Sequence, residues 1–148
     1  MHSRRVAALG TIDDDGKPFV SMVPYALMPA LGYLVIHVSG LAVHTCNLMA
    51  RPKVALLVMQ SEVSGEPVHS LPRVTFEGEA VVLEPFSFAW EACRAAYLER
   101  FPDAEFMTQL GDFMFVAIEV TSARQVAGFG AARSIDEEEV RLALGPAQ

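Results

Sequence analysis

Four polar side chains stand between two apolar runs in residues 35–59: Ser39, His44, Thr45 and Asn47. Hydroxyl, amide and imidazole groups all donate hydrogen bonds, and a helix that begins just after Ser39 would add free backbone N–H groups at the same point. Donors gathered in this way can replace much of the hydration of a phosphate. N-caps and structural histidines produce the same spacing, so a phosphate seat and four structural side chains remain alternative interpretations.

A series of short strands is expected around these residues. Apolar and β-branched runs bounded by turn residues predict strands at 6–12, 19–26, 33–39, 54–59, 74–83, 113–120 and 124–129. The Asp13-Asp14-Asp15-Gly16 turn joins the first two into a hairpin, and Gly78 marks a bulge or a close backbone contact.

Helices are expected at only a few crossings between these strands. Residues 41–50 have approximate helical spacing and end before a proline, and residues 135–144 begin with acidic side chains that favour the first turn of a helix. A third helix should pack one aromatic-rich face in the core: Phe86, Trp90, Cys93, Tyr97 and Phe101. Because the regular alternation of strand and helix is missing, the sequence predicts an α+β, mostly β fold built as an antiparallel barrel.

Length and composition narrow the function classes. The 148 residues predict a single domain, 1–148, and 52% hydrophobic against 20% charged residues suggests a buried subunit interface. A net charge of −7 opposes non-specific nucleic-acid binding. The absence of a long apolar run or a secretory signal predicts a cytoplasmic protein outside the membrane. Cys46 and Cys93 are expected to be reduced, and their spacing does not suggest a metal site.

Several motifs together resemble one known family. The segments GTIDDDGKPFVSMVPYA and IHVSGLAVHTCNLMARPKVALLV are similar to the FMN-binding split-barrel family related to pyridoxamine 5′-phosphate oxidase. Within that family, Ser21-Met22-Val23-Pro24 and the turn from Ser39 to Leu48 resemble the haem-utilisation (HugZ-like) branch. The later segments YLERFPDAEFMTQLGDFMFVAIEV and ARQVAGFGAARSID extend the similarity over nearly the whole chain.

The resemblance implies a fold, a cofactor and a partner. It implies a six-stranded antiparallel split β-barrel with short flanking helices, and a homodimer that holds FMN in clefts at the subunit interface. His44 would occupy the position of a basic phosphate ligand, and Arg4 or Arg5 would add charge. The implied flavin contacts are Ser21, Val23, Ser39, His44, Thr45 and Asn47.

Three departures from the family pattern alter this expectation. The oxidase relatives place several Arg and Lys residues around the phosphate, whereas this chain has Ala42, Val43 and His44, so weak FMN affinity is expected. Residues 128–148 lack a counterpart of the arginines and aromatic residues that hold pyridoxamine phosphate, so vitamin B6 oxidation is not expected. HugZ-like proteins ligate haem iron through a C-terminal histidine, but no histidine follows His69 here, which excludes that route.

The leading hypothesis is an FMN-binding oxidoreductase that acts on an unknown small substrate, with no obvious catalytic acid or base. The alternatives are a haem-binding or haem-degrading HugZ-like protein, in which His37 or His44 approaches iron, and a non-catalytic flavin-binding module. His37 is interpreted as a hydrogen-bonded structural histidine. Asp112 and Arg133 are interpreted as a turn residue and a surface cation.

Overall fold

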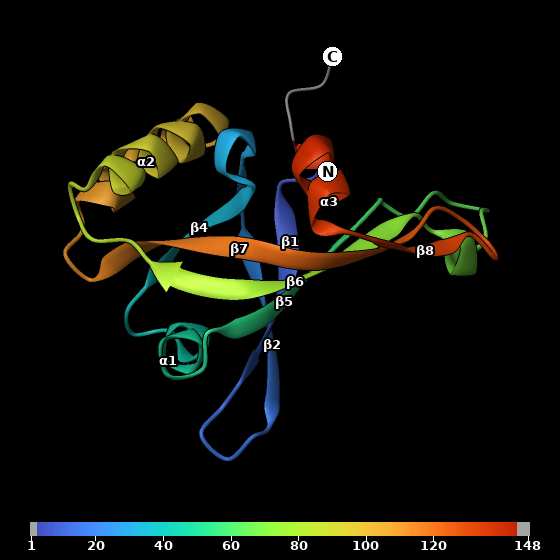
Figure 1. Ribbon diagram of the computed structural model, residues 1–148, viewed down its shortest axis with the longest axis horizontal. Helices are drawn as coiled ribbons and strands as arrows, with labels where there is room; N and C mark the ends of the chain where they lie inside the picture. The colour runs from blue at the N-terminus through green and yellow to red at the C-terminus, as the bar shows by residue number, and fades with distance from the viewer. Residues whose placement is uncertain (1–2, 145–148) are drawn as a thin grey trace.

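One curled antiparallel sheet carries the fold in the computed structural model, which describes residues 3–144 (Figure 1). The strands are β1 (Val6–Ile12), β2 (Pro18–Pro24), β3 (Ala26–Met28), β4 (Tyr33–Ser39), β5 (Lys53–Met59), β6 (Arg73–Val82), β7 (Phe113–Val126) and β8 (Ala132–Ile135). Their order is β2-β1-β5-β6-β7-β4-β3, and β8 pairs with β7. Three α-helices, α1 (Val43–Ala50), α2 (Phe88–Arg100) and α3 (Glu137–Leu144), and the 3-10 turns Pro29–Leu31, Val68–Ser70 and Pro102–Gln109 complete the described part.

The interior of the curled sheet forms the main core. Leu9, Ile36, Leu56 and Ile118 are fully buried there, and α3 contributes Leu144 to the same cluster. Because side chains alternate along a strand, every second residue of each central strand faces this interior. The expected α+β, mostly β split barrel is confirmed, although the described sheet has eight strands rather than six because β3 and β8 add short edges.

A second core lies between the outer face of the sheet and α2. Val35 on β4 and Phe115 on β7 pack there against Cys93, Tyr97 and Phe101. The strand β4 is therefore covered on both faces, which explains its continuous apolar run. The expected aromatic face of α2 is confirmed for these buried residues. Both cysteines are free thiols, with Cys46 exposed and Cys93 buried.

Two details of the expected elements were wrong. Phe86 lies before α2 and is 80% exposed, because the Ser87 hydroxyl accepts a hydrogen bond from Trp90 N and caps a helix that begins at Phe88. The strands predicted at 113–120 and 124–129 form the single strand β7. The intervening polar residues do not make a turn, because the hydroxyls of Thr121 and Ser122 donate to Glu77 on the neighbouring β6.

The bulge predicted at Gly78 is confirmed. The pairing of β6 with β7 shifts register between Glu77 and Gly78, and a Cβ at Gly78 would collide with the backbone carbonyl of Glu119. Only glycine therefore permits this approach of the two strands. Within residues 3–144, no helix is long and apolar enough to cross a membrane.

Candidate functional site

A hydrogen bond between Ser21 and His44 joins two of the predicted site residues. Ser21 lies on β2 and His44 in the first turn of α1, and Ser21 Oγ is 3.0 Å from His44 Nδ1. The imidazole is half-buried, and burial lowers its pKa below the usual 6.5. Burial thus favours the neutral imidazole and weakens the positive charge that His44 could offer a phosphate. Among residues 3–144, its Nε2 has no hydrogen-bond partner.

Ser39 is held by an acidic residue that the sequence did not assign to the site. Its hydroxyl donates to Asp112 Oδ2 at 3.2 Å and accepts a hydrogen bond from Leu41 N at the same distance. Antiparallel pairing of Ser39 with Phe113 brings the two segments together, and Gly40 N donates to the Asp112 carbonyl at 2.6 Å. The Asp112 carboxylate thus lies where the phosphate interpretation needs positive charge.

Three other predicted site residues face the interior. Val23 is a core residue with 2% exposure, and Thr45 is fully buried, with no hydrogen-bond partner for Oγ1 among residues 3–144. Asn47 is also buried, and its Nδ2 donates to Thr11 Oγ1 on β1 at 3.1 Å, which fixes α1 against the barrel. Their contacts with a ligand, like those of Ser21, Ser39 and His44, stay predictions.

The arginines that could add positive charge to the predicted site make contacts elsewhere. Residues 33–50 contain no Lys or Arg, and Arg51 pairs with Asp14 at 2.7 Å. Arg4 Nη1 donates to Ser61 Oγ, and Arg5 donates to the Arg100 carbonyl at 3.4 Å. Both arginines therefore make their hydrogen bonds away from His44. Arg133 is an exposed cation paired with Glu139, as expected.

His37 lies in an aromatic environment on the α2 side of the sheet. It is 7% exposed, and its ring centroid is 4.4 Å from that of Phe115 and 5.2 Å from that of Phe113. Burial lowers the pKa of His37 to about 4, so the ring is neutral. The expected buried position is confirmed, but the expected hydrogen bond is absent within the described residues, where Nδ1 has no partner.

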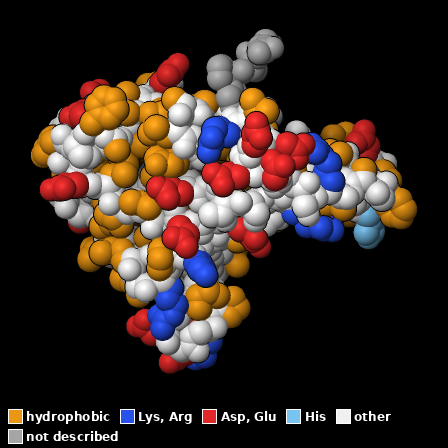
Figure 2. All heavy atoms as spheres, viewed as in Figure 1, with side chains coloured by type: hydrophobic (Ala, Val, Ile, Leu, Met, Phe, Trp, Pro, Cys, Tyr) orange, Lys and Arg blue, Asp and Glu red, His pale blue; other side chains and the backbone are white. Residues whose placement is uncertain are grey.

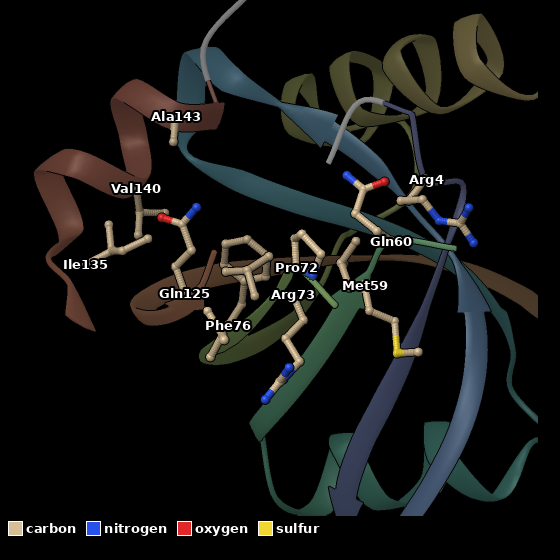
Figure 3. A pocket seen from close by; sticks show the side chains of 13 residues that line it. Arg4, Met59, Gln60, Pro72, Arg73, Phe76, Gln125, Ile135, Val140 and Ala143 are labelled. Atoms are coloured by element: carbon tan, nitrogen blue, oxygen red, sulfur yellow. The ribbon is translucent and has the colours of Figure 1, made fainter. Parts of the chain in front are cut away.

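A cavity of about 170 Å³ opens between α3 and the strands, away from the predicted site (Figure 3). Ile135, Val140 and Gln125 line one side, and Arg4 and Gln60 stand on the other. None of the six predicted site residues lines this cavity. The guanidinium group of Arg4 points away from the other labelled side chains (Figure 3), and Arg73 also lines the cavity, so its lining is mixed polar and apolar.

Asp112 is the residue near the site that sequence reasoning missed. Its interpretation as a turn residue agrees with the hydrogen bond from Phe113 N to the Leu110 carbonyl. Its second role depends on the pairing of β4 with β7, two strands separated by more than seventy residues of chain. No local signal in the sequence records that pairing.

Comparison with known proteins identifies the family. A family model described as Pyridoxamine 5′-phosphate oxidase matches residues 1–127. The chain belongs to this family. The match covers β1 to β7, and so includes β2, β4 and α1, which carry the predicted site.

Several proteins that are similar to this chain have names that refer to haem. The chain is 30% identical over 138 residues to Heme oxygenase HutZ of Vibrio cholerae serotype O1, covering 93% of this chain and 77% of that protein. It is 38% identical over 118 residues to the chloroplastic Non-canonical heme oxygenase HOZ of Arabidopsis thaliana, covering 80% of this chain and 34% of that protein. A heme binding protein from Mycobacterium smegmatis superposes with a TM-score of 0.86 at 29% identity, over 95% of this chain and 56% of that one. These names support the haem-utilisation branch, and the chain spans only part of the second and third proteins.

Proposed function

We propose that this chain binds haem at the Ser21–His44 pair, in preference to FMN. The main support is the charge around Ser39, where the FMN phosphate was expected. Ser39 donates a hydrogen bond to the Asp112 carboxylate, and no Lys or Arg occurs in residues 33–50. A phosphate dianion next to a carboxylate is repelled, and a seat of this kind has no cation to offset the repulsion. Haem has no phosphate group and does not meet this repulsion at its ring.

His44 has the features of an iron ligand. Neutral imidazole is the form that binds a metal, and a ligating histidine commonly uses its other ring nitrogen in a hydrogen bond that fixes the ring. Here the Ser21 hydroxyl bonds Nδ1, which leaves Nε2 available for iron. Leu41 and Val43, 84% and 54% exposed, offer apolar surface next to it in the chain. When bound, haem would supply the oxygen and redox chemistry, while the chain's own residues bind and orient it.

Because two relatives are named as haem oxygenases, degradation of the bound haem is the activity to assay. FMN is the second candidate ligand, because the chain belongs to the pyridoxamine 5′-phosphate oxidase family and the hydroxyls and N–H groups around α1 can donate to phosphate. We also propose that the chain forms a homodimer with clefts at the interface and is cytoplasmic. If FMN is the ligand, the protein would act on a small-molecule substrate.

An absorption titration with hemin tests the haem proposal. Purified protein should give a saturable shift of the Soret band, and His44→Ala should weaken binding at least tenfold and change the visible bands that report axial ligation. His69→Ala is the matched control, because His69 is an exposed histidine on the loop between β5 and β6. A titration of the unmodified protein that does not saturate would exclude specific haem binding. Identical spectra for the His44→Ala and His69→Ala variants would exclude His44 as the iron ligand. Loss of the Soret band after a reductant is added in air would then demonstrate turnover.

A further inference from the structure

An aromatic-lined cavity lies between α2 and the segment that leads into β7. Its volume is about 430 Å³, and Phe86, Trp90, Leu110 and Phe113 form its apolar walls. Cavities of roughly 300–1,000 Å³ are the usual size of small-molecule sites. Hydrophobic side chains also gather over the end of the molecule where α2 lies (Figure 2). Neither Ser21 nor His44 lines this cavity, so a ligand here would bind independently of haem.

Phe86 occupies a strained backbone position at the cavity wall. Ser87 N donates to the Glu84 carbonyl at 3.1 Å across a turn with Pro85 and Phe86 at its centre, and Phe86 has a φ of 65°. A turn of this kind favours glycine at that position, because a side chain is disfavoured at positive φ. The ring is 80% exposed, so core burial does not offset the strain. Strained residues of this sort are concentrated at ligand sites.

The rings of Phe86 and Trp90 form one wall suited to a planar ligand. Their centroids are 5.2 Å apart with planes inclined by 49°, and Trp90 meets the buried Phe115 ring edge-on at 5.7 Å. Trp90 is thereby fixed to the core while Phe86 stands outside it. Aromatic rings stack on or meet other rings at such separations, so a planar aromatic ligand matches this wall.

Arg94 supplies the charge for recognition of an acidic group. It lines the same cavity, and its side chain is 27% exposed. Its carboxylate partner, Glu105, is 3.8 Å away and largely exposed, whereas strong guanidinium–carboxylate contacts are roughly 2.7–2.9 Å long. Glu91 also lines the cavity but is exposed to water, which screens its charge. Arg94 can therefore exchange a weak contact for a bidentate one with a ligand.

We infer that this cavity binds a planar aromatic carboxylate, with Phe86 and Trp90 against the ring and Arg94 on the carboxylate. Trp90 is the one tryptophan of the chain, so its fluorescence reports directly on the cavity. The probe is 4-nitrobenzoate, a planar aromatic acid that quenches tryptophan, and 4-nitrobenzamide is its neutral counterpart. Saturable quenching by the acid, with at least tenfold weaker binding of the amide, is the expected result.

Two variants and a control separate a binding role from a structural one. Arg94→Gln and Phe86→Gly should each weaken 4-nitrobenzoate at least tenfold, and Phe86→Gly should unfold at the same or a higher urea concentration because the backbone strain is relieved. Phe88→Ala should bind as the unmodified chain does, since Phe88 is equally exposed but does not line the cavity. Collisional, unsaturable quenching that is alike in all variants would overturn the site. Equal binding of acid and amide would overturn the assignment of an anion, and a lower urea midpoint for Phe86→Gly would overturn the role of Phe86.

Discussion

At the residue scale, we expect Ser21 to act on the proposed ligand through His44. Its hydroxyl is 3.0 Å from Nδ1, and loss of a group that orients a metal-binding histidine typically costs about 10–100-fold in affinity. We expect Ser21→Ala to weaken hemin about tenfold without shifting the Soret maximum of the saturated complex, because the ligand itself is retained. A spectrophotometric titration measures both quantities. Affinity unchanged from the unmodified chain would show that the hydroxyl does not position the ring.

His37 makes stability depend on pH. Its pKa falls from 6.5 in the unfolded chain to about 4 in the folded one, so the unfolded state binds more protons between these values. Stability should therefore decrease as pH falls from about 6.5 to about 4, by up to roughly 3 kcal/mol from this residue. Urea unfolding at pH 7 and pH 4.5 should show a smaller loss for His37→Leu than for the unmodified chain. The exposed His69→Leu should retain the full loss, and equal losses in all three proteins would contradict the assignment.

The family resemblance, rather than local chemistry alone, selected two residues that meet in the structure. Ser21 and His44 were both predicted site residues, and they are hydrogen-bonded. The acidic partner of Ser39 was not predictable, because the contact requires β4 to pair with β7. The lowered pKa of His44 was likewise not predictable from residue type, since only burial in the folded chain causes it.

At the element scale, Gly78 allows β6 and β7 to pair. Replacement by alanine would place a Cβ against the Glu119 carbonyl, which is backbone and cannot move aside. We expect Gly78→Ala to lower the free energy of unfolding by at least about 2 kcal/mol. Gly10→Ala is the control within the same sheet, because the nearest atom to its new Cβ would be 3.6 Å away. Urea unfolding measures both, and equal stabilities would contradict this role of the bulge.

Strand boundaries were predictable where turn residues separate the strands. The prediction was wrong where polar residues form hydrogen bonds between strands. The hairpin turn at residues 13–16 was recognised because Asp13 and Gly16 have turn chemistry, and Gly16 N donates to the Asp13 carbonyl. Thr121 and Ser122 have the polar character of a loop, but their hydroxyls donate hydrogen bonds to Glu77 on the neighbouring strand. Phe86 followed the helical spacing, yet the Ser87 cap excludes it from α2.

At the scale of the whole molecule, the outer face of β2 is the expected contact with a second copy. This strand ends the strand order, and Val20 and Met22 are 67% and 64% exposed on it. Apolar side chains on an edge strand are a common basis of association. We expect a dimer by multi-angle light scattering, and a monomer when Val20 and Met22 are both replaced by lysine. Leu142→Lys, on α3 and 76% exposed, should remain dimeric. A monomer in the unmodified chain at micromolar concentration would contradict the homodimer.

The negative charge beside Ser39 is proposed to select haem over FMN. The most direct measurement is a pair of equilibrium titrations of the same protein preparation, with hemin followed by absorbance and FMN followed by fluorescence quenching, each repeated with Asp112→Asn. We expect hemin to bind at least tenfold more tightly than FMN, and FMN affinity to rise when the Asp112 carboxylate is neutralised. Tighter binding of FMN by the unmodified chain would contradict selection of haem and make the region from Ser39 to Asn47 a phosphate site.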